Sequence, residues 1–122
     1  MSLAIDHVQL AGPPGCEDDA RGFYAGLLGL EEIEKPEPMR ASGGVWFRIG
    51  RQELHVGIED PFSPNCKAHP GLAAEDVDAV AARLAAAGAP VAWDDRYPGV
   101  RRFYTADPFG NRIEVLAAAG AG

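Results

Sequence analysis

The sequence predicts an α+β fold built from two modules, each with the element order β-α-β-β-β. Three observations support it: the order occurs twice, each half has one amphipathic helix, and the other apolar residues alternate over short stretches. We expect the first module over residues 1–59, a turn-rich linker over 60–66, the second module over 67–117 and a tail over 118–122. A chain of 122 residues suits one compact domain, so both modules are expected to serve a single function.

The first half begins with a strand-like stretch and continues into an amphipathic helix. Residues 3–12 alternate between two faces, and "GPPG" at 12–15 ends the strand. Apolar residues then recur at spacings of three and four, which is typical of a helix with one buried face. These residues are Ala20, Phe23, Tyr24, Leu27 and Leu28. Three more strands are expected at 31–35, 45–50 and 52–58, with a loop at 36–44.

The second half repeats this order. A strand candidate at 67–74 contains His69, and a helix over 75–88 has Val77, Val80, Ala81 and Leu84 on one face. Three short strands are expected after it, at 90–95, 101–107 and 111–116, separated by turns with proline and glycine.

When the halves are overlaid, two kinds of polar residue match. His7 in the first strand corresponds to His69, and Glu53 in the last strand of its module corresponds to Glu114. Alternation places all four on the sheet face away from the helices. Sheet packing does not require matched histidines and glutamates, whereas a divalent metal requires imidazole nitrogens and carboxylate oxygens brought to one point. The repeat therefore predicts a metal site formed by these four residues.

His55 is the alternative fourth ligand. It shares a face with Glu53, and the two lie roughly 6.6 Å apart along an extended strand that rises ~3.3 Å per residue. Both residues could hardly bind one ion without a bend in the strand. The overlay favours Glu53, while His55 stays open as a ligand, as a hydrogen-bond donor to a ligand, or as a neighbouring wall residue.

Three motifs resemble the vicinal oxygen chelate superfamily, which includes glyoxalase I, bleomycin resistance proteins, fosfomycin thiol transferases and extradiol dioxygenases. They are "IDHV" at residues 5–8, "FYAGLLGL" at 23–30 and "DPFGNRIEVL" at 107–116. The last resembles the family's ending Asp-Pro-x-Gly-x-x-x-Glu, and the likeness covers essentially the whole chain. The resemblance implies a glyoxalase-like fold, in which the two modules form a curved mixed sheet that makes a cup around a divalent ion.

The resemblance also implies a function. Members of the superfamily hold two neighbouring oxygens of a substrate or intermediate on a divalent metal, so we expect a metal-dependent, glyoxalase-like isomerase or lyase acting on a small substrate. The metal would be Ni, Co, Zn, Mn or Fe, bound by His7, His69, Glu114 and either Glu53 or His55. In a glyoxalase-like reaction a carboxylate ligand can leave the metal and act as a base, for which Glu53 and Glu114 are the candidates.

Candidates for substrate binding are the residues expected to project into the cup. They are Gln9, Trp46, Arg48, His55, Arg102 and Tyr104. Arg102 and Tyr104 face one way and their neighbours Arg101 and Phe103 the other, and the sequence leaves open which pair lines the cup. An arginine there would suit an anionic substrate. The substrate itself depends on loops whose conformation no periodicity fixes.

Three other functions are compatible with these motifs. A metal-free ligand-binding or antibiotic-resistance protein of the bleomycin-binding type shares the fold, and the matched polar residues count against it. An extradiol dioxygenase uses two histidines and one carboxylate with Fe(II) or Mn(II), a set that fits this chain if Glu53 does not ligate. A vestigial site on a dimerising module is the third. A fosfomycin thiol transferase is disfavoured, because Gln9 stands where that family has a hydroxyl residue.

Composition and charge exclude several partners. The net charge of −7 argues against a nucleic-acid surface, which needs a basic patch. No apolar run approaches the ~18–20 residues of a membrane span, and no leader sequence is recognised, so a cytoplasmic protein is expected. We also expect a homodimer, because two small modules leave sheet edges exposed. The sequence does not decide whether modules pair within one chain or between two.

Overall fold

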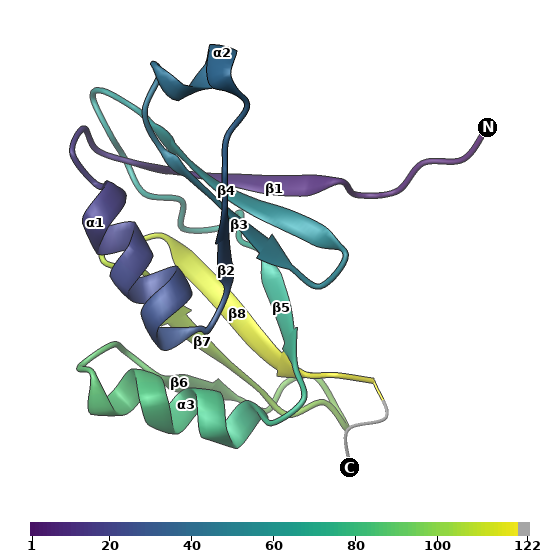
Figure 1. Cartoon of the computed structure of the whole chain (residues 1–122). Helices are drawn as coiled ribbons and strands as arrows, with labels where there is room; N and C mark the ends of the chain where they lie inside the picture. The colour runs from purple at the N-terminus through teal and green to yellow at the C-terminus, as the bar shows by residue number, and fades with distance from the viewer. Residues whose placement is uncertain (120–122) are drawn as a thin grey trace. The chain divides into compact units, whose positions relative to one another are not determined.

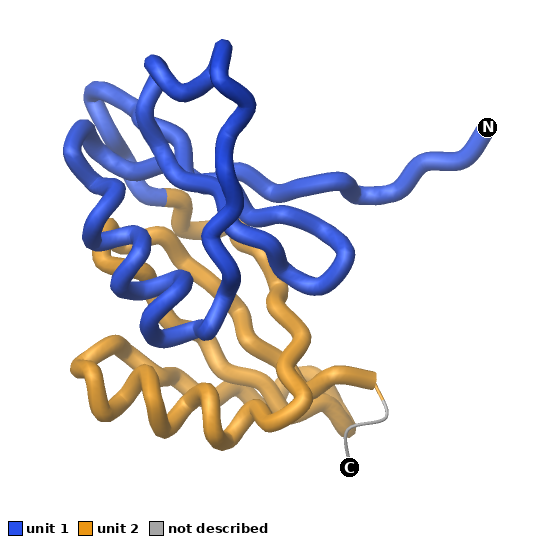
Figure 2. The backbone as a smooth tube through the Cα atoms, viewed as in Figure 1, with its two compact units in different colours: residues 1–64 blue, residues 65–122 orange. Residues whose placement is uncertain are grey.

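The computed structural model describes residues 1–119, and the chain divides into two compact units, residues 1–64 and 65–122 (Figure 2). Of the tail expected at 118–122, residues 120–122 lie outside the described part of the chain. No helix within residues 1–119 is long and apolar enough to cross a membrane. Both units have the β-α-β-β-β order predicted from the repeat (Figure 1).

The first unit is built on a four-stranded mixed sheet. Its elements are β1 (His7–Gly12), α1 (Glu17–Ala20), η1 (Arg21–Leu27), β2 (Glu31–Ile33), α2 (Glu37–Arg40), β3 (Val45–Ile49) and β4 (Gln52–Ile58). The strands lie in the order β1-β4-β3-β2, with β1 parallel to β4 and the other neighbours antiparallel. Helix α1 runs on into the π-helical turns of η1, which pack against β2 and β3.

The second unit has the same topology. Its elements are β5 (Gly71–Ala74), α3 (Val77–Ala86), β6 (Ala92–Asp94), β7 (Arg102–Ala106) and β8 (Arg112–Ala117), with strand order β5-β8-β7-β6. Strands β5 and β8 are parallel and the other neighbours antiparallel. Asp76 caps the start of α3, because its side chain accepts a hydrogen bond from the backbone N–H of Ala79. The predicted α+β class with two β-α-β-β-β modules is therefore confirmed.

One face of each sheet is apolar and lies under the helix of its unit. In the first unit Tyr24 of η1 packs on Phe47 of β3, with ring centroids 5.5 Å apart, and both side chains are fully buried. In the second unit α3 contacts β5 and β8. The buried strand residues are Val45, Phe47, Leu54 and Val56 in the first sheet, and Phe103, Ile113 and Val115 in the second. Because side chains alternate, the residues between them project from the opposite face.

Three element boundaries differ from the sequence-based prediction. The first strand begins at His7 rather than residue 3, because the register of β4 offers a partner only from Glu53 onward. The strand expected at 67–74 begins at Gly71, after Pro70, which has no N–H to donate to a ladder. His69 therefore lies just before the strand and not within it. The loop expected at 36–44 contains a short helix, α2, that begins after Pro36.

Candidate functional site

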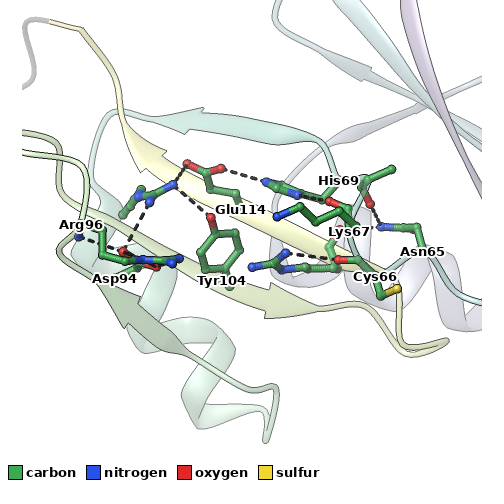
Figure 3. A network of polar contacts seen from close by, with 11 residues as sticks. Asn65, Cys66, Lys67, His69, Asp94, Arg96, Tyr104 and Glu114 are labelled. Atoms are coloured by element: carbon green, nitrogen blue, oxygen red, sulfur yellow. Dashed lines mark hydrogen bonds and ion pairs between the residues drawn. The ribbon is translucent and has the colours of Figure 1, made fainter.

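The second unit brings His69 and Glu114 into direct contact (Figure 3). Nε2 of His69 lies 3.0 Å from Oε1 of Glu114, and Nδ1 of His69 lies 2.9 Å from the backbone oxygen of Lys67. A carbonyl oxygen can only accept, so Nδ1 must carry the hydrogen. In the neutral imidazole, Nε2 then points a lone pair at a carboxylate oxygen. Two acceptor atoms this close must share a hydrogen, carried by either atom, or lie beside a metal ion.

The motif "DPFGN" explains how the chain places Glu114. Oδ1 of Asp107 accepts hydrogen bonds from the backbone N–H groups of Phe109 (3.0 Å) and Asn111 (2.9 Å), and Oδ2 accepts from the amide of Asn111 (2.8 Å). Asp107 and Asn111 are both buried. These bonds close the turn between β7 and β8 and so fix the register in which β8 starts. The acidic signature residue at 107 is thus structural, while the glutamate at 114 is the candidate functional residue.

Asn65 holds the segment that carries His69 against β8. Its side-chain amide donates to the backbone oxygens of Arg112 (3.1 Å) and Ala68 (2.6 Å), and its backbone N–H donates to Asn111 (3.3 Å). The backbone N–H of Glu114 also donates to Pro70 (3.0 Å). The irregular segment before β5 is therefore tied to β8 by main-chain and amide contacts, which bring the two side chains together.

Arg102 and Tyr104 lie on the same sheet face as Glu114. Tyr104 is the cross-strand partner of Glu114, and Arg102 donates from Nη1 to Glu114 (3.2 Å) and to the Tyr104 hydroxyl (3.0 Å). Phe103 points into the core, and Arg101 forms an ion pair with Asp78 of α3 at 2.6 Å. Arg102 and Tyr104 are thus the pair beside the polar residues.

The neighbours of Glu114 favour its ionised form. Burial raises its pKa, but hydrogen bonds from His69 and Arg102 outweigh burial, and the pKa lies below the usual 4.5. Because the unfolded chain takes up this proton at a higher pH than the folded chain does, Glu114 stabilises the fold above about pH 4.5 and loses that contribution as pH falls through its folded pKa.

We therefore expect the free energy of unfolding of the wild type to fall more steeply than that of Glu114→Gln when pH is lowered from about 6 to about 3. Urea denaturation at a series of pH values measures both slopes. Equal slopes in the two proteins would show that the pKa of Glu114 is the same in the folded and unfolded states.

In the first unit, His55 lies between two rings. The Trp46 ring stacks on the His55 ring, with centroids 3.8 Å apart and planes 1° apart. The His7 ring also stacks on the His55 ring, with centroids 4.4 Å apart and planes 16° apart. His55 is only 4% exposed, and its Nε2 lies 2.9 Å from Oε1 of Glu53. His7 is more exposed, and its Nδ1 lies 2.9 Å from Oδ1 of Asp6. The unit thus gathers His7, Glu53 and His55 beside Trp46.

Two further predicted residues lie on this face. Gln9 is the cross-strand neighbour of His55, and its side chain packs over Gly57, where an added Cβ would lie 2.6 Å from the amide nitrogen. Arg48 is the cross-strand neighbour of Glu53 and is exposed. The predicted set in the first unit is therefore brought together around β4.

The strand registers show how the two units correspond. His7 is two residues before Gln9, which pairs with His55; His69 is two residues before Gly71, which pairs with Glu114. If the two histidines match, His55 and not Glu53 is the equivalent of Glu114. The burial pattern agrees, since buried Leu54 and Val56 flank His55 as buried Ile113 and Val115 flank Glu114. Glu53 therefore cannot correspond to Glu114 if His7 corresponds to His69.

Aromatic residues show the same correspondence. Trp46 pairs across strands with His55, and Tyr104 pairs with Glu114. An aromatic side chain thus stands beside the candidate ligand on the last strand of each unit. Under the register, the equivalent of Glu53 is Arg112, whose guanidinium lies 4.0 Å from the centre of the Tyr104 ring.

The donor atoms in each pair have the chemistry and spacing of metal ligands. Two atoms about 2.1 Å from one ion and about 3.0 Å apart subtend an angle of about 90°, which suits octahedral coordination. The contacts of 2.9 Å in the first unit and 3.0 Å in the second are hydrogen-bond lengths, and two ligands of one ion can have the same separation. Within residues 1–119 no group of three or more His, Cys, Asp or Glu side chains is arranged to hold an ion. Each unit, taken by itself, thus offers a two-atom set.

One residue of the second unit was missed by the sequence analysis. Asp94 lies opposite Arg102 in the ladder between β6 and β7, and its Oδ1 accepts from Nη2 of Arg102 at 3.3 Å. Arg96 bonds the same carboxylate, with Nε 2.9 Å from Oδ2. The sequence offered one signal for Asp94, namely that an acidic residue alternates with Trp93 in a short strand. Its partner could be known only from the register of the sheet.

Comparison with known proteins gives a consistent result. The family model for the glyoxalase-like domain matches residues 16–116. A protein from Bacillus anthracis assigned to the glyoxalase family is similar over 96% of both chains, with 46% identity and a TM-score of 0.92. Lactoylglutathione lyase from Agrobacterium tumefaciens has 26% identity over 96% of this chain and 95% of its own, with a TM-score of 0.74.

More distant structures share the fold. The fosfomycin resistance protein FosX from Listeria monocytogenes has 20% identity over 97% of this chain and 95% of its own, with a TM-score of 0.76. No match was found among functionally curated proteins.

Proposed function

Because the chain belongs to the glyoxalase-like domain family, we propose that it is a metal-dependent enzyme of the glyoxalase type. It performs an isomerase or lyase step on a small substrate or intermediate whose two neighbouring oxygens are held on a divalent ion. The family and the 26% identity to a lactoylglutathione lyase support this class of reaction.

The observation that carries the proposal is the contact between His69 and Glu114. Metal-binding histidines commonly donate their second ring N–H to a backbone carbonyl or a carboxylate, which fixes the ring and its tautomer. His69 does so through the oxygen of Lys67, at 2.9 Å, and leaves Nε2 facing a carboxylate. Nδ1 of His7 has the corresponding contact with Asp6, also at 2.9 Å. Both histidines are therefore oriented as ligands that present Nε2.

In this proposal His69 and Glu114 are the candidate ligands of the second unit, and His7 with His55 or Glu53 are the candidate ligands of the first unit. A bound divalent ion would stabilise negative charge that develops on a substrate oxygen. The register favours His55 over Glu53 as a ligand of the first unit. Glu53 would then accept a hydrogen bond from Nε2 of His55 at 2.9 Å, which leaves Nδ1 of His55 for the ion. Being 28% exposed, Glu53 would also serve as the base that takes a proton from a substrate carbon.

Arg48 is better suited than Arg102 to an anionic group of the substrate. Arg102 already contacts two carboxylates, those of Glu114 and Asp94, so most of its charge is compensated. Arg48 is exposed on the face that carries Trp46 and His55. A substrate carboxylate bound there would form the two parallel hydrogen bonds that a guanidinium offers.

Metal content tests the proposal. Protein purified without chelator should contain a stoichiometric first-row divalent metal by elemental analysis, and should take up Zn²⁺ after stripping. His55→Gln should lose more metal than Glu53→Gln, because the register makes His55 the ligand.

Light scattering of the same sample should give the mass of a homodimer, which the exposed apolar residues Leu3 and Ile5 beside edge strand β1 favour.

Protein that contains no metal and takes up none on soaking would contradict the proposal. It would favour the metal-free ligand-binding alternative on the same fold.

A further inference from the structure

Arg102 is the centre of the polar network in the second unit. It is 13% exposed, and its Nη1 donates to Glu114 while its Nη2 donates to Asp94. A cation this buried is stable only when hydrogen-bonded acids compensate it. The contacts arise from the sheet itself, since Asp94 pairs with Arg102 across β6 and β7, and Tyr104 pairs with Glu114 across β7 and β8.

Charges alternate along this network. Arg96 holds Asp94, Asp94 holds Arg102, Arg102 holds Glu114, and Glu114 faces His69 (Figure 3). Asp94 is itself only 13% exposed. Without Asp94, Arg102 would lose one of its two acidic partners. The neighbouring charges thus hold the guanidinium in the place from which it reaches Glu114.

The two oxygens of Glu114 have different partners as a result. Oε2 accepts from Arg102 at 3.2 Å, and Oε1 lies against Nε2 of His69 at 3.0 Å. A guanidinium hydrogen-bonded to one carboxylate oxygen takes up a lone pair of that oxygen and leaves the other oxygen as the better ligand for an ion. On the premise of the proposed function, we propose that Arg102, held by Asp94, is a positioning residue that fixes Glu114 as a one-oxygen metal ligand.

This role replaces the substrate contact expected of Arg102 and adds Asp94 to the site. It also connects the site to a cleft of about 500 Å³, because Asp94 and Arg102 line that cleft together with Trp93, Tyr97 and Val100. A molecule that enters the cleft would touch the same two side chains that hold Glu114. The loop after β6 is in this way linked to the orientation of a ligand.

Zn²⁺ binding by calorimetry tests the inference with two conservative variants. Arg102→Lys keeps the charge but loses the fork, and Asp94→Asn keeps the shape but loses the charge. Each should raise the dissociation constant for Zn²⁺ by about 10- to 100-fold, which is typical of losing a group that orients a ligand. The control is Asp78→Asn, which removes the partner of Arg101 in an exposed ion pair. This variant should change the dissociation constant for Zn²⁺ by less than about 2-fold.

A double-mutant cycle separates positioning from a general loss of structure. In a Glu114→Gln background, Arg102→Lys should cause little further loss of Zn²⁺ affinity, because the charged carboxylate that Arg102 positions is gone. An equal penalty in both backgrounds, or unchanged affinity in both single variants, would overturn the inference while leaving the proposed function intact. A wild type that binds no Zn²⁺ would instead overturn the proposed function.

Discussion

His69→Ala is expected to lower the affinity for Zn²⁺ by more than about 100-fold. Loss of a residue that only orients a ligand costs about 10- to 100-fold, and a ligand itself counts for more. The side chain of His69 is partly accessible and its Nε2 already lies 3.0 Å from Glu114, so its removal deletes a donor without disturbing a core. Calorimetric titration of stripped protein with Zn²⁺ measures the change.

Lys67→Ala is the matched control for His69→Ala. The contact of His69 with residue 67 uses only the backbone oxygen, so removing the lysine side chain leaves it in place. We expect this variant to bind Zn²⁺ within about 2-fold of the wild type. Undiminished binding by His69→Ala, or an equal loss in both variants, would show that the imidazole is not a ligand.

Asp107→Ala is expected to lower the free energy of unfolding by about 3 kcal/mol. Its carboxylate accepts hydrogen bonds from Phe109 and Asn111, and alanine would remove that acceptor. A buried N–H that loses this acceptor is no longer solvated by water and has lost a hydrogen bond. The loss of stability therefore exceeds that of an ordinary hydrogen bond. Urea denaturation at neutral pH measures this change in the free energy of unfolding.

Asp95→Ala controls for removal of an acidic residue as such. Asp95 is an exposed residue of the loop after β6, and its loss should change the free energy of unfolding by less than about 0.5 kcal/mol. A similar small effect for Asp107→Ala would mean that the turn between β7 and β8 does not depend on its carboxylate.

The repeat made most of the fold predictable. Apolar residues at three- and four-residue spacing predicted the helices that bury Phe23 and Leu84, and alternation predicted β4 and β8 with their inward faces. Such patterns are local, so a single sequence carries them in full. Strand β5 begins later than the pattern predicts, because Pro70 has no N–H to donate to the ladder.

The candidate site was predictable in composition but not in detail. Alternation placed His55 and Glu53 on one face, yet the choice between them rests on the register of β1 against β4. The same holds for Asp94, whose partner Arg102 lies on another strand. Register depends on turns and packing across the whole sheet, and a one-dimensional pattern does not contain it.

The position of the bound ion tests the central claim most directly. Crystals of the wild type grown with Zn²⁺, measured at the zinc absorption edge, should show an anomalous peak about 2.1 Å from both Nε2 of His69 and Oε1 of Glu114. Crystals of His69→Ala prepared in the same way should lack that peak. A wild-type map with no peak beside these two atoms, or with zinc bound only elsewhere, would contradict the account.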